Sequence, residues 1–228
     1  MLGTMLNSVA DQISGIYRLM RAGKGIEAET AARRLQQQYP AQGDVNHALA
    51  LVLIKQGKDG EAIVFAKAAV KAEPRNALYL VNLGRLFLKY EVVEDALPLL
   101  ENAMKFNSSL YEAPRAMGEF FHQIGNGHRA ASYLKQALAI SPSSQRHQIE
   151  MQLVEVLTSL GQAEEAERLL KPLTEIDRFR VEALVQLAGL RRHTVDSGIF
   201  GLLQNELQGG SPSPEASATL HNAIGRIL

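Results

Sequence analysis

Histidine is the residue type in this sequence best suited to bind a metal or to exchange protons near neutral pH. Its six occurrences are His47, His122, His128, His147, His193 and His221. No two of them are three or four residues apart, so no helix presents the paired ligands of an H-E-x-x-H zinc site. The sequence also has no cysteine, which excludes a thiolate site and a disulfide. We therefore expect no metal and no cofactor.

Two further patterns could carry catalysis, and each has a simpler structural interpretation. Lys24 follows Gly23 without the G-x4-G-K-[ST] spacing that cradles phosphate, and we interpret this segment as a turn. Glu164 and Glu165 stand where a helix should begin, and carboxylates there stabilise the positive end of the helix dipole. No serine lies in a G-x-S-x-G motif. We therefore expect no catalytic residue in this chain.

The composition describes an ordinary folded chain without a strong electric field. With 228 residues, 46% of them apolar, the chain can bury a sizeable core. Its 24 basic and 24 acidic residues balance, so no global attraction favours nucleic acid or an anionic membrane. Met1–Ala10 has no basic segment followed by a long apolar run, and no stretch reaches the roughly 18 apolar residues of a membrane span. We expect a cytoplasmic protein.

The elements that must position any functional residue follow a repeat of about 34 positions. Small residues mark it at Ala28, Ala62, Ala96 and Ala130, and at Ala166 after 36 further positions. The turn position five residues before each marker is occupied by Gly23, Gly57, Glu91, Gly125 and Gly161. The position twelve residues after each marker is occupied by Pro40, Pro74, Ser108, Pro142 and Arg178. This period is typical of two helices joined by a turn and repeated along the chain.

The residue types at these positions have physical reasons. Short side chains let antiparallel helices approach closely, so we expect Ala50, Gly84 and Gly118 on first helices to face the alanines of second helices. Glycine in the turn permits the positive φ that ends a helix, and proline after the second helix prevents its continuation. Pro98 and Pro172 fall inside second helices, and we expect Pro172 to kink its helix near Lys171.

These spacings resemble the tetratricopeptide repeat, with its signature W-x2-L-G-x2-Y, then A-x3-F, then Pro. Leu83-Gly84, Phe87 and Ala96 match it in one segment, and Met117-Gly118, Phe121 and Ala130 match it in the next. The resemblance implies an all-α fold, a right-handed superhelical solenoid of helix-turn-helix repeats. After an N-terminal extension at residues 1–8, we place five repeats in 9–180, at 9–42, 43–76, 77–110, 111–144 and 147–180.

Beyond Arg180 the repeat pattern fades. We place a degenerate helical pair at 181–207 (Val181–His193 and Ser197–Leu207), a loop at 208–217 and a truncated half repeat at 218–228. The half repeat has an apolar stripe, Leu220, Ile224 and Leu228, without a second helix to cover it. We therefore expect this end to fray or to self-associate.

The C-terminal segment has a second resemblance. The order of a repeat array, Arg191-Arg192-His193-Thr194, a Pro/Ser loop and Leu220–Gly225 looks like the junction between the array and the catalytic domain of bacterial TPR-sulfotransferases. It implies an alternative function, in which the chain recruits substrates for a sulfotransferase-type enzyme whose catalytic domain lies outside this sequence. The catalytic domain's phosphate-binding loop is absent from these residues.

In tetratricopeptide proteins the first helix of each repeat lines a concave groove, so the resemblance implies binding positions. The groove-binding residues are Tyr17, Arg21, His47, Lys55, Arg85, Lys89, Arg115, Glu119 and His122. Arg21, Lys55 and Lys89 occupy equivalent places and could form a stripe for an acidic peptide, because Arg and Lys pair with anionic groups. They could equally be solvated residues at helix ends.

Two more specific functions of the family lack their residues here. Tyr17 and Ala48 stand where the carboxylate clamp of chaperone-binding members would need asparagines, and only Asn82 fits the asparagine ladder of the TPR glycosyltransferases. The sequence therefore predicts a scaffold that binds a protein or peptide ligand, is not itself an enzyme and has neither nucleic acid nor membrane as a partner.

Overall fold

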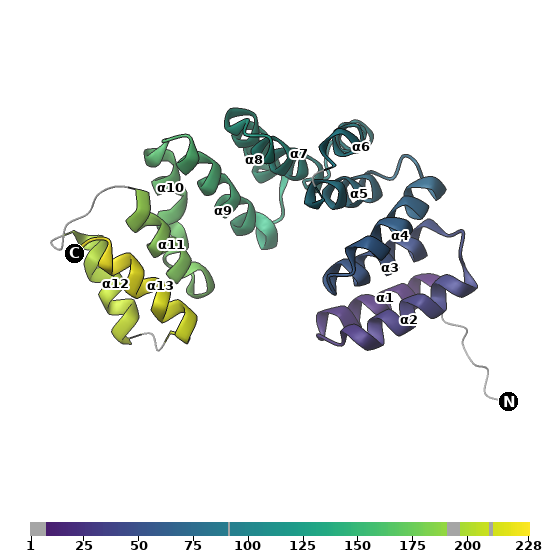
Figure 1. Ribbon diagram of the computed structural model, residues 1–228, viewed down its shortest axis with the longest axis horizontal. Helices are drawn as coiled ribbons and strands as arrows, with labels where there is room; N and C mark the ends of the chain where they lie inside the picture. Colours follow the sequence, from purple (N-terminus) through teal and green to yellow (C-terminus); the bar gives the residue numbers. More distant parts are fainter. Residues whose placement is uncertain (1–7, 91, 191–196, 210–211) are drawn as a thin grey trace. The chain divides into compact units, whose positions relative to one another are not determined.

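A computed structural model describes residues 8–90, 92–190, 197–209 and 212–228, and every regular element in these ranges is an α-helix (Figure 1). The predicted all-α repeat fold is thereby confirmed. The chain divides into two compact units, residues 1–120 and 121–228, with α7 (Glu112–Gln123) crossing the boundary. Expectations that depended on Glu91 or on residues 191–196 lie outside the described ranges.

Unit 1 consists of consecutive helix pairs followed by the first turns of α7. The helices are α1 (Val9–Arg21), α2 (Gly25–Gln38), α3 (Gly43–Lys55), α4 (Asp59–Ala72), α5 (Ala77–Lys89) and α6 (Val93–Phe106). From α1 to α6 each helix packs on the next along the chain, and α1 also packs on α3 (Figure 1). A capping box in which Ser8 and Asp11 exchange hydrogen bonds begins α1, because it satisfies backbone N–H groups that the helix leaves unpaired.

The turns between paired helices use glycine as expected from the sequence. Gly23 and Gly57 in unit 1 have φ values of 74° and 72°, and Gly125 and Gly161 in unit 2 have φ values of 76° and 71°. After Gly23, the amide of Lys24 donates to the carbonyl of Leu19 at 3.0 Å, the long hydrogen bond of a Schellman motif. The repeat therefore ends its first helices by one local device.

The small residues lie in the core where the paired helices meet. The markers Ala28, Ala62 and Ala96 are fully buried. A Cβ built on Gly84 of α5 would lie 2.8 Å from Cδ2 of Leu100 and 3.6 Å from the carbonyl oxygen of Ala96, both on α6. The expected close approach at Gly84 is confirmed, and it explains why a larger residue is excluded there.

Unit 2 continues with helices of less regular length. They are α8 (Gly127–Ile140), α9 (Ser143–Ser159), α10 (Ala163–Leu173), α11 (Asp177–Leu190), α12 (Gly198–Gly209) and α13 (Pro214–Gly225). Helix α9 begins at Ser143, directly after its N-cap Pro142, so the two extra residues of this repeat lengthen α9. The loop expected at 208–217 is shorter, because α12 reaches Gly209 and α13 begins at Pro214.

The expected kink at Pro172 is wrong, because the helix ends there. Helix α10 stops at Leu173, and the amides of Thr174 and Glu175 donate back three residues, to Lys171 at 3.3 Å and to Pro172 at 3.3 Å. Pro172 lacks the N–H that would bond to the carbonyl of Arg168, and the tight turns that follow it end the helix. The next helix accordingly begins at Asp177 and not at Val181.

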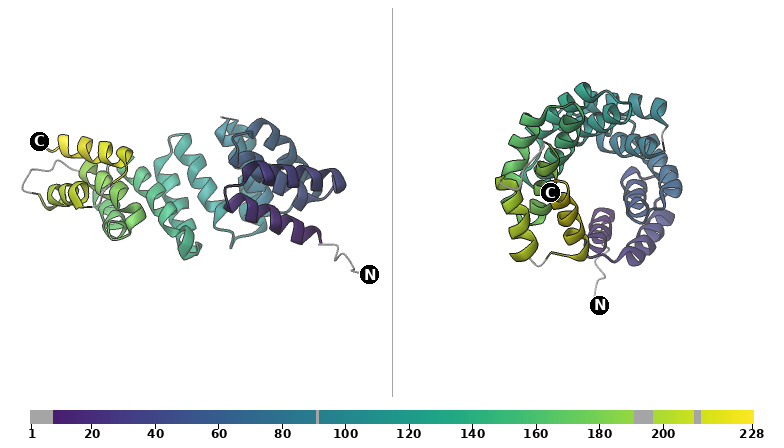
Figure 2. Two further views of the ribbon diagram at one scale, coloured as in Figure 1. Left: turned by 90° about the horizontal axis from the view of Figure 1, so that it is seen from below. Right: turned by 60° about the vertical axis from the view of Figure 1, so that its left-hand side comes forward.

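The expectation of an uncovered C-terminal helix is also wrong. Helices α11, α12 and α13 pack against one another (Figures 1 and 2). Leu184, Leu203 and Leu220, one from each helix, are buried together, and Ile224 packs against this cluster. The three helices bury each other's apolar faces without the repeat's Gly and Ala markers. Of the stripe, Leu228 alone is largely exposed, at 82%.

Candidate functional site

The binding positions that the sequence implied lie mainly on the first helices of unit 1. Tyr17, Arg21, Lys55, Arg85, Lys89, Arg115 and Glu119 extend from α1, α3, α5 and α7. We refer to the surface carrying these seven side chains as the first-helix face. Among the seven, Arg85 and Arg115 contact Glu119, and Lys55 contacts the backbone of α1.

A buried polar cluster connects two of the first helices, α3 and α5. His47 of α3 is only 5% exposed, and its ring centre lies 4.6 Å from that of Tyr79 on α5. Nε2 of His47 lies 2.7 Å from the amide nitrogen Nδ2 of Asn82. Since an amide nitrogen only donates, Nε2 accepts and the ring proton lies on Nδ1. Asn82 thus holds His47 in one tautomer.

Burial also fixes the charge state of His47. Desolvation lowers the pKa of the imidazole to about 4, and the nearby charge of Asp44 opposes this only partly. His47 is therefore neutral at physiological pH. It contributes an aromatic packing surface and an acceptor for Asn82, and it adds no positive charge to the face.

Asp44 joins two tyrosines to this cluster. The hydroxyl of Tyr79 donates to Oδ1 of Asp44. Burial raises the pKa of Tyr79, and the hydrogen bond to Asp44 raises it further. Burial also raises the pKa of Tyr17, with a second contribution from the charge of Asp44. Both phenols therefore stay protonated, and Tyr79 acts as a hydrogen-bond donor.

Arg85, Glu119 and Arg115 form the charged centre of the face. The guanidinium of Arg85 donates from Nε and NH2 to the two carboxylate oxygens of Glu119, at 2.8 and 3.0 Å. Nε of Arg115 lies 3.5 Å from Oε1 of the same carboxylate. Desolvation lowers the pKa of Arg115, whose side chain is 15% exposed. The two arginines that were expected to bind an acidic ligand are thus already engaged within the chain.

Lys89 and Lys55 make different contacts although their positions are equivalent. Nζ of Lys89 pairs with Oδ2 of Asp59 at the start of α4, a carboxylate that is 4% exposed. Nζ of Lys55 donates to the carbonyl oxygen of Met20 on α1 at 2.6 Å, beside the exposed Arg21. Among the described residues neither Lys55 nor Arg21 forms an ion pair. The expected stripe of three cations is therefore reduced to Arg21 and Lys55.

His122 lies near the end of α7, in the part of this helix that belongs to unit 2. Its Nε2 lies 3.7 Å from Oε1 of Glu155 on α9, and both side chains are exposed. The face also depends on two residues that the groove assignment omitted, Asp44 and Tyr79. Their position on first helices was readable from the sequence, but no spacing rule indicates that a tyrosine and a carboxylate 35 residues apart would bond.

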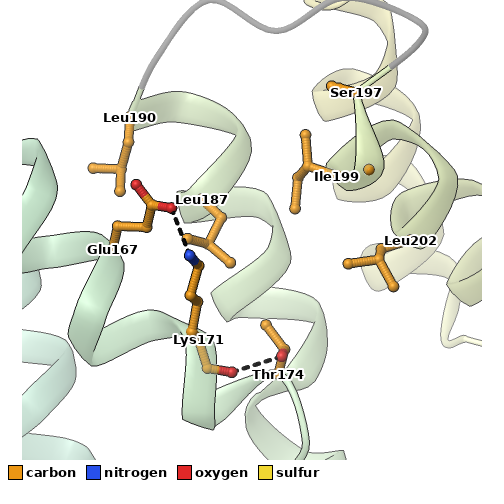
Figure 3. Close-up of a pocket in the computed structure, with 9 residues that line it drawn as sticks. Glu167, Lys171, Thr174, Leu187, Leu190, Ser197, Ile199 and Leu202 are labelled. Carbon is orange, nitrogen blue, oxygen red and sulfur yellow. Dashed lines mark hydrogen bonds and ion pairs between the residues drawn. The ribbon is translucent and has the colours of Figure 1, made fainter.

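Unit 2 contains a cavity of about 420 Å³ between α10, α11 and α12 (Figure 3). Leu187, Leu190, Ile199 and Leu202 give it mainly apolar walls, and Lys171 pairs with Glu167 at 2.9 Å on its rim. In the described part of the chain, no three or more acidic, histidine or cysteine side chains gather to hold a metal ion.

The arrangement defines an all-helical repeat protein, and comparison with known proteins gives the kind of repeat. The family model for the tetratricopeptide repeat matches residues 121–188. No curated protein matches the sequence. Together with the solved structures below, this match shows a tetratricopeptide-repeat fold. The resemblance of the C-terminal segment to a sulfotransferase junction receives no support.

Similar solved structures cover most of the chain. One is Pseudomonas aeruginosa pilF, with 15% identity, a TM-score of 0.71 and coverage of 94% of this chain and 96% of that one. Another is a thermophilic TPR protein of Thermus thermophilus, with 21% identity, a TM-score of 0.68 and coverage of 80% and 98%. A chain of the APC/C hetero-tetramer Cut9-Hcn1 has 15% identity and a TM-score of 0.78, with coverage of 97% of this chain and 44% of that one. At these identities the likeness establishes the fold alone.

Of the described helices, none combines the length and apolar character needed to cross a lipid bilayer.

Proposed function

We propose that this chain is a protein-binding scaffold and that the first-helix face of unit 1 holds a segment of its partner. Tetratricopeptide folds present side chains from successive helices toward an extended ligand, which suits an extended or helical peptide. The buried cluster of His47, Tyr79, Asn82 and Asp44 makes this surface preorganised, because its side chains already hold one another in place.

The observation that carries the proposal is the position of Lys55. Its ammonium group is held against a neutral carbonyl at 2.6 Å, so it retains its full charge and its remaining N–H donors. Arg21 lies next in sequence to the residue that provides this carbonyl. These two cations therefore suit a carboxylate or another anionic group of a partner segment.

Arg85 has a secondary role in this proposal. A partner carboxylate can reach its guanidinium only by replacing Glu119, whose two oxygens already occupy the bidentate geometry. Arg85 therefore contributes to selectivity, since a weakly acidic segment would not displace Glu119. This assigns the anchoring role to Arg21 and Lys55, while Arg85 and Arg115 are already engaged by Glu119.

The experiment is photo-crosslinking in cells of the source organism. A photoreactive amino acid is placed at Leu51, on α3 between the cluster and Lys55, and in a second strain at Val64, which is 62% exposed on α4. We expect one partner to be captured from Leu51 and not from Val64. The double variant Arg21→Glu/Lys55→Glu should abolish its capture, whereas the exposed second-helix variant Lys71→Glu should leave it unchanged.

Equal capture from both positions, or capture that survives the double charge reversal, would assign the partner to another surface. Circular dichroism of the double variant should show unaltered helix content, because both side chains are exposed. The alternative function, a substrate-recruiting arm for a sulfotransferase-type enzyme, rests on residues outside the described ranges and on α13. That helix packs one face, Leu220 and Ala223, within its own bundle, and no described contact favours this alternative.

A further inference from the structure

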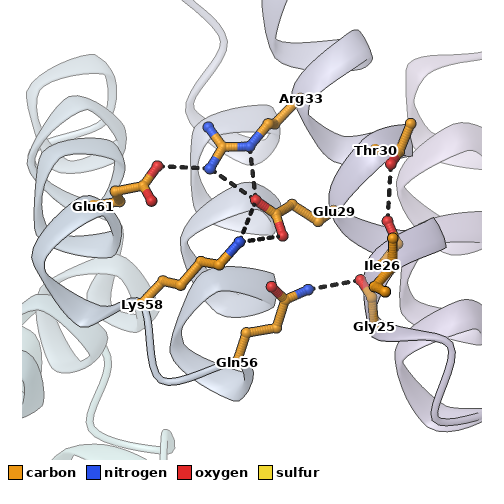
Figure 4. A network of polar contacts seen from close by, with 8 residues as sticks. All are labelled: Gly25, Ile26, Glu29, Thr30, Arg33, Gln56, Lys58 and Glu61. Carbon is orange, nitrogen blue, oxygen red and sulfur yellow. Dashed lines mark hydrogen bonds and ion pairs between the residues drawn. The ribbon is translucent and has the colours of Figure 1, made fainter.

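The junction between the first two helix pairs is closed by a network of charged side chains (Figure 4). Nζ of Lys58, just before α4, donates to both oxygens of Glu29 on α2, at 3.0 and 2.8 Å. Arg33 of α2 reaches back across the junction, with NH2 2.6 Å from Oε2 of Glu61 on α4. The hydrogen bond from Lys58 is the main reason that the pKa of Glu29 is lowered. Glu29 and Arg33, four residues apart on α2, thus form ion pairs with Lys58 and Glu61, which are three residues apart.

The same Lys and Glu occur one repeat earlier, on the opposite side of the first helix pair. Lys24 and Glu27 precede Lys58 and Glu61 by 34 residues each. Among the described residues, no helix lies before α1 to present a matching Glu and Arg. Lys24 and Glu27 instead pair with each other at 3.4 Å, with side chains 56% and 58% exposed. Within the described residues, the first helix pair therefore carries the Lys and Glu of such a junction without the Glu and Arg that would pair with them.

These two residues border a groove on the outer side of α1 and α2. Its volume is about 1180 Å³, and its apolar lining includes Ile16, Leu19, Ala31 and Leu35. Ile26, between Lys24 and Glu27, is 84% exposed. An isoleucine with that exposure beside an apolar groove is a residue that gains free energy when another element covers it.

The charges around the groove are unbalanced. Its lining contains three cations, Arg18, Lys24 and Arg34, and one carboxylate, Glu27. At the position equivalent to Arg18, the second pair has the apolar residue Val52, which is 1% exposed. An occupant of the outer groove must therefore bring carboxylates that the inner junction does not need.

We propose that the outer face of α1 and α2 docks a helical hairpin of a partner protein, one helix of which carries a Glu and an Arg or Lys four residues apart on an otherwise acidic edge. The Glu pairs with Lys24 and the basic residue pairs with Glu27, as Glu29 and Arg33 pair with Lys58 and Glu61. Further carboxylates of the partner compensate Arg18 and Arg34. The apolar side of the hairpin covers Ile26 and the groove.

A second copy of this chain is a poorer occupant for two reasons. Its Glu29 and Arg33 are already engaged by Lys58 and Glu61 and are not available to pair elsewhere. Two outer faces meeting each other would bring Arg18, Lys24 and Arg34 of both copies together, a repulsion that the two Glu27 carboxylates do not balance. We therefore expect the chain to remain monomeric through this face.

The test supplies the missing counterpart from the chain's own sequence. In a tandem chain, residues 9–42 occur twice in succession, so that Glu29 and Arg33 of the added copy face Lys24 and Glu27 of the original. We expect one cooperative urea transition with a higher midpoint and a larger m value than in the natural chain. Lys24→Glu in the original copy should lower that midpoint, and Glu29→Lys in the added copy should restore it. In the natural chain, Lys24→Glu should leave the midpoint nearly unchanged.

The same pairing is measured between molecules with a labelled peptide of residues 8–42 and the full chain. We expect saturable binding that weakens about tenfold with Lys24→Glu and recovers with a peptide carrying Glu29→Lys. The proposal would be overturned if the added hairpin unfolds in a separate transition. It would also be overturned if Lys24→Glu lowers the urea midpoint equally in the natural and the tandem chain. Concentration-dependent dimerisation of the natural chain that Lys24→Glu abolishes would overturn it in favour of a second copy.

Discussion

Arg85 and Glu119 stand 34 residues apart, one repeat length, and form a two-point ion pair with distances of 2.8 and 3.0 Å. The pair connects α5 to α7 on the first-helix face, where the sequence alone predicted a free cation. Its consequence is that two arginines share one carboxylate, so the centre of this face carries a net charge of +1 instead of two free cations. In the proposed binding mode, the anionic part of a partner therefore contacts Arg21 and Lys55, which form no ion pair among the described residues.

The first prediction concerns the strength of this pair. Single variants Arg85→Ala and Glu119→Ala and the double variant form a cycle, and we expect a coupling energy of about 0.2–1 kcal/mol, because Arg85 is 42% exposed. Urea unfolding of the four proteins gives this energy.

Glu119→Gln provides the functional comparison. It removes the carboxylate that Arg85 and Arg115 share, so capture of an acidic partner from Leu51 should increase. A coupling energy that stays the same at 1 M salt would contradict an electrostatic pair. Reduced capture with Glu119→Gln would contradict the interpretation that Glu119 neutralises part of the arginine charge.

The helices and their punctuation could be predicted from the sequence because they rest on local rules. Gly23 and Gly57 adopt positive φ where the turn requires it, and the alanine markers are buried where the helices cross. These features depend on residue type at a fixed position. They transfer from one repeat to the next without knowledge of the neighbouring side chains.

The charge pairing could not be predicted in this way. Lys55 and Lys89 occupy the same position in successive repeats, yet one donates to a backbone carbonyl and the other to Asp59. The difference arises because Asp59 replaces Gly25 of the preceding repeat, and a rule that considers only the lysines omits it. The α11–α13 bundle was missed for a related reason, since Leu184, Leu203 and Leu220 pack without any repeat marker.

The second prediction concerns the closest helix crossing. Gly84→Ala would place a Cβ 2.8 Å from Cδ2 and 3.1 Å from Cγ of the fully buried Leu100. Overpacking costs about 1–3 kcal/mol, and the better helix propensity of alanine offsets about 1 kcal/mol of it. We expect a net loss of stability, measured by urea unfolding.

Gly60→Ala is the matched control. Gly60 lies in α4 of the same unit, and a Cβ there would meet nothing within 4 Å. The variant should be neutral or more stable by up to about 1 kcal/mol. Equal effects of the two substitutions would show that propensity, and not the crossing at Leu100, decides the outcome.

The third prediction is a pH dependence caused by His47. Its pKa is about 4 in the folded chain and close to 6.5 when unfolded, so between these values the unfolded chain binds more protons. Stability should therefore be complete above pH 6.5 and fall as the pH decreases toward 4. The loss amounts to about 3 kcal/mol. Below pH 4 this contribution should not change further.

Urea unfolding at pH 7, 6, 5 and 4 measures this slope. His47→Gln keeps an acceptor for Asn82 but cannot titrate, so its stability should change less over the same range. His128→Gln, at an exposed position, should follow the natural chain. A natural chain and a His47→Gln variant with parallel slopes would show that other groups cause the pH dependence.

The fourth prediction concerns α13. Leu220 is fully buried against Leu184 and Leu203, so Leu220→Ala leaves a cavity in the three-helix cluster and should cost about 2–5 kcal/mol. Leu228→Ala, at a position 82% exposed, should change stability by less than about 0.5 kcal/mol.

Hydrogen exchange of the backbone amides in Pro214–Gly225 reports directly on this cluster. In the natural chain these amides should be protected in a monomer, because α11 and α12 already cover the apolar face of α13. Leu220→Ala should accelerate their exchange, while those of α8 (Gly127–Ile140) should keep their rates. Rapid exchange of α13 amides in the natural chain would contradict the packed bundle and restore the expectation of an uncovered, fraying C-terminal helix.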